Sequence, residues 1–191
     1  MDEAAALRLR QAVRRTQDVT RERVATGRGL EEADDIAGTF ATDGAIGFDP
    51  IPFLRALCEA GSQAVVIGQV AGIMHGSMEL TGDLDLLWDG TPEQAHALRN
   101  ALAATGCTNL PDLGRSQVAY RVASVSGDLC TPALPWGNMD TASCLDRAAS
   151  ARDPAGFTIR YTALDDLIHM RRSLGRPKDH RRADELARLH P

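Results

Sequence analysis

The strongest constraint on the fold is the stretch of residues 64–88, which reads AVVIGQVAGIMHGSMELTGDLDLLW. It predicts a short buried strand, a glycine turn, a helix of small residues and a second strand that begins with two aspartates. Because strand side chains alternate between faces, Asp83 and Asp85 point the same way and can reach one cation. Mg²⁺ prefers carboxylate oxygens, and the start of a helix after Gly68 can receive a phosphate. The stretch therefore predicts a site for Mg²⁺ and a nucleotide.

The length and composition fit a single soluble domain with a small appendage. The 191 residues are 43% hydrophobic and 25% charged, which is ordinary for a globular protein. A net charge of −5 gives no general attraction to nucleic acid, so any such contact needs a local basic patch. No segment approaches the ~20 apolar residues of a membrane span, and the first residues lack the apolar run of a signal peptide. We therefore expect a cytoplasmic protein with no membrane partner.

The cysteines and the lysine are distributed unevenly. The four cysteines lie far apart and form no C-x-x-C pair, which disfavours zinc and favours buried thiols: Cys58, Cys107, Cys130 and Cys144. Arginine is used almost everywhere in place of lysine, and the single lysine is Lys178. It is either a point charge for a phosphate or an ordinary surface residue beside a turn.

The N-terminal part differs from the rest of the chain. Residues 3–26 show helical spacing and carry six arginines, which form either a face for RNA or a partner protein or a solvated helix surface. Residues 27–49 are rich in Gly, Asp and Thr and indicate a linker or a loosely packed arm. We predict a helical arm and linker over 1–49 and a compact domain over 50–191.

The compact domain alternates between predicted helices and strands. Helices are predicted over 51–60, 69–75, 92–105, 140–151, 164–174 and 180–189, and strands over 64–67, 83–88, 117–125, 128–131 and 157–161. Thr162 and Asp165 match a capping box, and Gly175 and Pro177 stop the helix that follows them. Asp179 is expected to cap the last helix. The fold class is α/β (α+β), with a small mixed sheet flanked by helices and an N-terminal helical extension.

Two blocks of the sequence carry a resemblance to a known family. The first block comprises Gly68-Gln69-Val70-Ala71, His75-Gly76-Ser77 and Thr81-Gly82-Asp83-Leu84-Asp85-Leu86. The second comprises Leu164-Asp165-Asp166-Leu167-Ile168-His169-Met170-Arg171 and Gly175-Arg176-Pro177-Lys178-Asp179. Together they resemble, over roughly residues 50–190, the nucleotidyltransferase superfamily of the DNA polymerase beta-like fold. The chain is most similar to the minimal, AbiEii-like, toxin–antitoxin-associated bacterial branch.

The resemblance implies a reaction and a set of site residues. It implies transfer of NMP or nucleotides from an NTP to a hydroxyl of a tRNA, a protein or a small molecule, with two Mg²⁺ ions, or Mn²⁺ in their place. A third carboxylate from a neighbouring strand would join Asp83 and Asp85 as a catalytic and metal-binding group. The expected nucleotide-binding residues are Gly68, Gln69, Thr81, Arg176 and Lys178.

The chain departs from the family pattern at two positions. Gln69 stands where the family prefers a small residue, and its side chain either crowds a triphosphate or donates to it. The third carboxylate is expected three residues after Gly127, where the chain has Cys130. Asp128 lies on the same face of that strand and can replace the missing ligand after a small shift in register such as a bulge.

Three functional hypotheses follow from these observations. The first is a Mg²⁺-dependent nucleotidyltransferase that uses Asp83, Asp85 and Asp128. The second is a degenerate binding module of the same fold that acts through a nucleotide or a cognate partner protein, as in a toxin–antitoxin pair. The third is an α/β scaffold in which Asp83 and Asp85 only pair with arginines.

Overall fold

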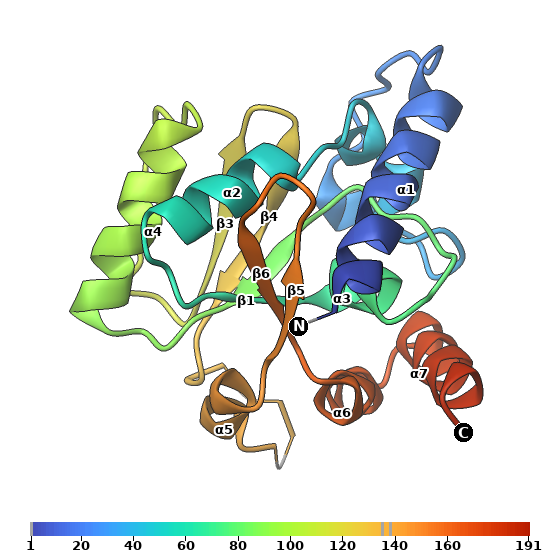
Figure 1. Cartoon of the computed structure of the whole chain (residues 1–191). Coiled ribbons are helices and arrows are strands. Elements are labelled where there is room, and N and C mark those ends of the chain that lie inside the picture. Colours follow the sequence, from blue (N-terminus) through green and yellow to red (C-terminus); the bar gives the residue numbers. More distant parts are fainter. Residues whose placement is uncertain (1, 135, 138) are drawn as a thin grey trace.

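The centre of the molecule is a six-stranded mixed sheet (Figure 1). The computed structural model describes residues 2–134, 136–137 and 139–191. The strands are β1 (Val65–Ile67), β2 (Asp85–Leu87), β3 (Gln117–Val122), β4 (Val125–Cys130), β5 (Ala149–Arg152) and β6 (Thr158–Tyr161). Their order is β3-β4-β2-β1-β6-β5, with parallel pairing of β1 with β6 and of β2 with β4. The three other pairs are antiparallel.

Helices cover both faces of the sheet, as Figure 1 shows. The helices of the described residues are α1 (Glu3–Thr20), α2 (Ile51–Glu59), α3 (Gly68–Met74), α4 (Pro92–Ala104), α5 (Thr141–Asp146), α6 (Leu164–Leu174) and α7 (Pro177–Leu189). One face, with Val66 and Leu86, joins the large core that includes residues of α2 and α4. The opposite face, with Ile67 and Leu87, packs with residues of α5 and α6. The expected small mixed sheet flanked by helices is confirmed.

The N-terminal residues contribute to the same core as the rest of the chain. Ala5, Leu9 and Val13 of α1 are buried in the large core together with Phe48. The α1 helix packs on α3 and β5, and the backbone N–H of Asp2 donates to Ser150 O at 3.0 Å. Within residues 1–49, predicted as an arm and a linker, α1 and Phe48 thus share the hydrophobic core of residues 50–191.

Several local predictions differ from the structure. The helix predicted over 3–26 ends at Thr20, and the strand predicted over 117–125 ends at Val122. The helix predicted over 140–151 ends at Asp146, and Ala149–Arg152 form an edge strand paired with β6. The predicted capping box fails because Thr162 donates its hydroxyl to Val66 O at 2.9 Å, and Ala163 is the N-cap of α6. The last helix begins at Pro177 rather than near residue 180.

Asp179 also has another role than the predicted helix cap. It lies in the first turn of α7 and accepts a hydrogen bond from Nε of Arg176, the N-cap residue, at 2.5 Å. The predicted stop at Gly175 is confirmed, since that residue has a φ of 70°.

Within the described residues, no helix combines the length and the apolar character that crossing a membrane requires.

Candidate functional site

A cavity of about 670 Å³ lies against the sheet face that α6 covers. Seven of the eight residues predicted for the site line it: Gly68, Gln69, Asp83, Asp85, Asp128, Arg176 and Lys178. The eighth, Thr81, is buried behind it and donates its hydroxyl to Oδ1 of Asp83 at 2.5 Å. The cavity therefore brings together residues that are more than a hundred positions apart in the chain.

Two of the three aspartates lie on neighbouring strands, and the third lies in the loop that enters one of them. Asp85 begins β2 and pairs with Ile67 of β1, while Asp83 lies two residues before it. Asp128 lies on β4, which runs parallel to β2, and its backbone N–H donates to Oδ1 of Asp85 at 3.0 Å. The common direction predicted for the Asp83 and Asp85 side chains is consistent with the structure, because both residues line the same cavity.

Two glycines permit this close arrangement. Gly68 has a φ of 66°, and a Cβ at that position would lie 2.8 Å from Oδ2 of Asp85. A Cβ on Gly127 would collide with the backbone carbonyl of Leu84. Glycine is therefore needed at the helix start beside Asp85 and at the point where β4 meets the segment entering β2.

The acidic side of the cavity has no compensating cation within ion-pair distance. Among the described residues, neither Asp83, Asp85 nor Asp128 forms an ion pair with an arginine, lysine or histidine. Burial raises the pKa of Asp85 well above its ordinary value, and the charges of Asp83 and Asp128 raise this pKa further. The hypothesis that Asp83 and Asp85 only pair with arginines is therefore wrong.

Asp128 reaches the cavity without the bulge considered from the sequence. The β3–β4 pairing is continuous from Gln117–Cys130 to Val122–Val125, so Asp128 and Cys130 share a face through ordinary strand alternation. Oδ2 of Asp128 accepts a hydrogen bond from Nε2 of Gln117 at 2.9 Å. Burial, together with Asp85 and Asp128, raises the pKa of Cys130 to about 12, so this thiol stays neutral beside the carboxylates.

The donor set suits Mg²⁺ bound together with a phosphate. No group of three or more His, Cys, Asp or Glu side chains in the described part of the chain forms a ready-made metal site. Magnesium is commonly bound by one or two carboxylates, with waters and substrate phosphates filling the other positions. Two adjacent carboxylates without a cationic partner match that pattern, so the residues present fit the ion.

Several basic residues also line the cavity. Arg176 directly precedes α7, Lys178 and Arg182 lie on α7, and Arg171 lies on α6. Arg176 and Arg182 form ion pairs with Asp179 and Glu79. Lys178 is 8% exposed, and no carboxylate of the described residues forms an ion pair with it. An anionic ligand in the cavity would therefore meet an ammonium group that has no carboxylate partner among the described residues.

The side-chain amide of Gln69 makes its hydrogen bonds to other residues of the protein. Its Nε2 donates to Ser77 Oγ at 3.1 Å and to Glu79 O at 2.8 Å, and its Oε1 accepts from Nη2 of Arg171 at 2.8 Å. Both alternatives raised from the sequence, crowding a triphosphate or donating to it, are therefore disfavoured. What Gln69 can offer a phosphate is its backbone N–H in the first turn of α3.

Arg171 contacts the start of α3 and lines the cavity. The sequence indicated no specific role for this residue. Its guanidinium donates to Gly68 O at 3.2 Å and to Arg182 O at 3.1 Å. Burial and the neighbouring Arg182 lower its pKa to about 10, so it remains charged at neutral pH. It adds buried positive charge at the point where the helix start faces the cavity.

Thr39 is a site residue that the sequence analysis missed. Its hydroxyl donates to Oδ1 of Asp83 at 2.7 Å, and the residue lines the cavity. The surrounding segment is poor in hydrophobic periodicity, and no local signal connects it to residues more than forty positions away.

Most arginines near the N-terminus form hydrogen bonds or ion pairs with other residues of the protein. Arg8 donates to Met74 O, Arg10 binds both carboxylate oxygens of Asp153, Arg21 pairs with Asp18, and Arg23 donates to Phe40 O. These contacts leave Arg14 and Arg15 for a solvent-exposed face and weaken the hypothesis of an RNA-binding helix.

Comparisons of the chain with models of protein families, with curated proteins and with solved structures find no match.

Proposed function

We propose that this protein is a Mg²⁺-dependent nucleotidyltransferase that moves an NMP from an NTP to a hydroxyl acceptor. The observation that carries the proposal is a single cavity lined by three aspartates, Asp83, Asp85 and Asp128, and by basic residues that include Arg176 and Lys178. A triphosphate with its metal needs both kinds of charge at close quarters. The acceptor classes remain those of the resemblance: a tRNA, a protein hydroxyl or a small molecule.

The acidic and the basic residues have distinct tasks in this proposal. Asp83 and Asp85 would hold Mg²⁺, which would supply positive charge to the triphosphate and to the leaving pyrophosphate. Lys178 and Arg176 bind phosphate oxygens, and the backbone N–H groups after Gly68 bind another at the helix start. Asp128 accepts the proton of the acceptor hydroxyl as that oxygen attacks the α-phosphorus.

A second function, nucleotide binding without transfer, is favoured by the position of the third carboxylate. Asp128 is hydrogen bonded to Gln117, and Cys130 occupies the position where the resemblance expects an acid. A protein with only Asp83 and Asp85 as ligands would bind a metal–nucleotide complex and act through it. Such a module suits a toxin–antitoxin component with a cognate partner protein.

The two functions are separated by measuring binding and transfer on the same samples. Calorimetric titration with Mg²⁺ and α,β-methylene NTPs reports binding, and incubation with each α-³²P-labelled NTP and total tRNA or protein reports transfer. Asp83→Asn should abolish both signals, whereas the matched variant Asp146→Asn, at an exposed position outside the cavity, should abolish neither.

The outcomes distinguish the proposals clearly. Transfer of label by the wild type supports the enzyme, and binding with no transfer from any of the four NTPs supports the binding module. Absence of both binding and transfer in a folded wild-type protein would exclude both functions.

A further inference from the structure

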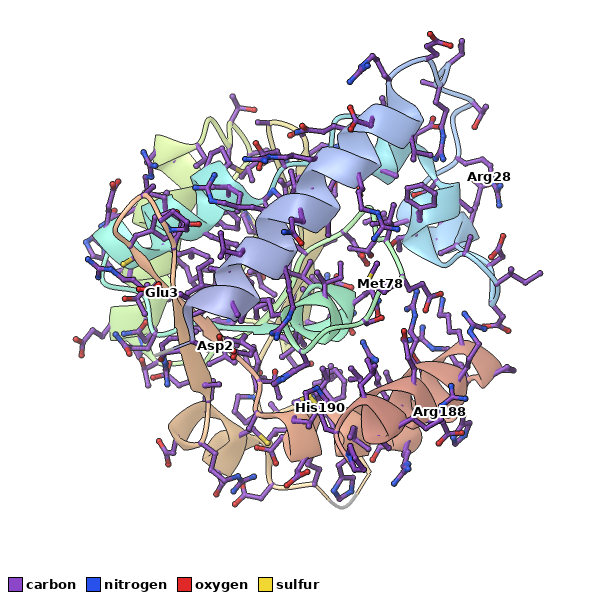
Figure 2. The ribbon with its side chains drawn as sticks, turned by 45° about the vertical axis from the view of Figure 1, so that its right-hand side comes forward. Asp2, Glu3, Arg28, Met78, Arg188 and His190 are labelled. Carbon is purple, nitrogen blue, oxygen red and sulfur yellow. The ribbon has the colours of Figure 1, made fainter. Side chains whose placement is uncertain are left out.

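The cavity is closed on one side by residues 29–45, which we call the strap. Gly29, Leu30, Glu31, Ala33 and Thr39 of the strap line the cavity together with the acidic and basic residues described above. In Figure 2, Arg28 marks the entry to the strap, and Arg188 marks α7 below it. The strap contains three short 3₁₀ turns, Leu30–Glu32, Thr39–Ala41 and Asp43–Ala45, and its backbone is held mainly by short local turns.

The strap is held at several places, one of which is Phe40 O, which accepts a hydrogen bond from Arg23. Two others involve α7 and the loop before β2. At one, Arg181 of α7 donates to Asp35 O at 2.8 Å and to Ile36 O at 2.9 Å. At the other, the strap packs closely on the loop before β2, where a Cβ on Gly82 would lie 2.5 Å from the backbone nitrogen of Ala45. The second anchor lies directly beside Asp83.

Thr39 makes the polar contacts of this second anchor. Its hydroxyl donates to Oδ1 of Asp83 at 2.7 Å, lies 2.8 Å from the hydroxyl of Thr81, and accepts from the backbone N–H of Gly82 at 3.2 Å. Thr81 donates to the same carboxylate oxygen at 2.5 Å. Among the described residues, both hydrogen bonds to the Asp83 carboxylate end on Oδ1 and none on Oδ2.

Two hydroxyl donors on one oxygen fix the rotation of a carboxylate. The donor from Thr81 comes from the same loop as Asp83, whereas the donor from Thr39 comes from a segment more than forty residues away. Groups that orient a metal ligand through hydrogen bonds are known to influence metal affinity strongly. The Oδ2 atom, which has no such partner, remains available for a cation.

We propose that Thr39 is a positioning residue that orients Asp83 for binding of the divalent cation, so that the strap completes the site. The inference rests on the proposed function in one respect, the assignment of Asp83 as a metal ligand. It assigns to residues 29–45 a part in ligand binding beyond covering the core.

The test is the affinity for Mn²⁺, measured by electron paramagnetic resonance of the free ion, with and without α,β-methylene ATP. Thr39→Val replaces the hydroxyl with a methyl group of nearly the same size. We expect the dissociation constant for Mn²⁺ to rise about tenfold. Thr39→Ser keeps the donor and should retain the wild-type affinity, and Thr39→Ala serves in place of valine if the latter does not fold.

Arg181→Met is the control, because it removes the contacts of Arg181 with the strap and with Glu79 and leaves the contacts of Asp83 in place. We expect this variant to bind Mn²⁺ like the wild type. If it weakens binding as much as Thr39→Val does, the strap acts only as a cover and the role of the Thr39 hydroxyl is disproved.

The two proposals can fail separately. A wild-type protein that binds Mn²⁺, together with a folded Thr39→Val variant that binds it equally well, would overturn the role of Thr39 and leave the proposed function intact. A wild-type protein that binds no Mn²⁺ under either condition would overturn both.

Discussion

The backbone N–H of Asp128 donates to Oδ1 of Asp85 across the β2–β4 boundary, at 3.0 Å. The Asp85 carboxylate thus has a neutral amide as its hydrogen-bond partner. The charges of Asp83 and Asp128 both raise the pKa of Asp85. An amide hydrogen bond stabilises the ionised form, but less than burial and two negative neighbours destabilise it. The ionised form of Asp85 is therefore electrostatically unfavourable in the folded protein, and a bound cation would reduce this cost.

Asp85→Asn should stabilise the folded protein and abolish cation-dependent ligand binding. Because the folded pKa of Asp85 is raised, ionisation costs stability, and this cost appears as the pH rises above the ordinary aspartate pKa of about 3.9. Asparagine keeps an oxygen acceptor for the Asp128 N–H and removes the charge. We expect a Tm increase of ~2–4 °C at pH 8, which corresponds to about 1 kcal/mol in a chain of this size.

Calorimetric scans of the wild type and the variant from pH 4 to pH 8 would check this prediction. The difference in Tm should shrink toward pH 4, where the wild-type carboxyl group is increasingly protonated. A variant that is less stable than the wild type at pH 8 would contradict the prediction and show that the Asp85 carboxylate stabilises the folded protein.

Much of the candidate site could be predicted from the sequence because the signals that indicate it are local. The step from β1 through Gly68 into α3, followed by Asp83 and Asp85, depends on hydrophobic runs, a glycine and strand alternation. These signals act within about twenty residues, and the cavity contains the residues they single out.

The remaining features depend on contacts that no local pattern encodes. Residues 149–152, rich in alanine, favour a helix by propensity but pair with β6 at the sheet edge. Thr162 has the spacing of a capping box, yet its hydroxyl donates to Val66 O of the neighbouring strand. Thr39 belongs to a segment without periodicity, and only the packing of that segment on Gly82 brings it to Asp83.

Gly68→Ala should destabilise the protein more than an alanine substitution at another glycine that has a positive φ but open space around the added Cβ. Gly68 has a φ of 66°, and the new methyl group would lie 2.8 Å from Oδ2 of Asp85. Positive φ alone costs about 1–2 kcal/mol for alanine, and displacement of Asp85 adds about 1–3 kcal/mol by overpacking. Urea unfolding measures the total.

Gly61→Ala supplies the control, since Gly61 has a φ of 72° and nothing within 4 Å of the added Cβ. It should show the backbone cost alone and leave ligand binding unchanged. Equal losses of stability in the two variants would mean that the Asp85 side chain moves away from the added methyl group with no loss of free energy of unfolding.

Arg10→Met should destabilise the protein by about 2 kcal/mol or more, because it leaves the buried carboxylate of Asp153 without its charged partner. Arg10 binds Asp153 with two hydrogen bonds of 2.7 Å, and the Asp153 side chain is fully buried whereas that of Arg10 is 27% exposed. This ion pair connects α1 to the turn between β5 and β6. Chemical unfolding should therefore report α1 as part of the cooperative fold, and Arg15→Met, at an exposed position of α1, should have little effect.

The same ion pair predicts how stability depends on pH. Burial tends to raise the pKa of Asp153, but hydrogen bonds from Arg10 and the Ala155 N–H outweigh it and lower this pKa. The stabilisation is therefore present at neutral pH and is lost as the pH falls below about 3.9 toward the folded pKa. Acid titration of the free energy of unfolding should show a smaller loss in Arg10→Met than in the wild type.

Lys178 should be protected from amine-reactive reagents when a metal–nucleotide complex occupies the cavity. It is the single lysine of the chain, so its acylation is read from one peptide by mass spectrometry without interference from other lysines. Its stem is buried, and no carboxylate of the described residues pairs with its ammonium group, which leaves the amine to a phosphate oxygen. We expect at least tenfold slower acylation with Mg²⁺ and α,β-methylene NTP, and an unchanged rate with Mg²⁺ and the nucleoside. Equal protection by the nucleoside, which has no phosphate, would place Lys178 beside the base or sugar and contradict its assignment as a phosphate-binding residue.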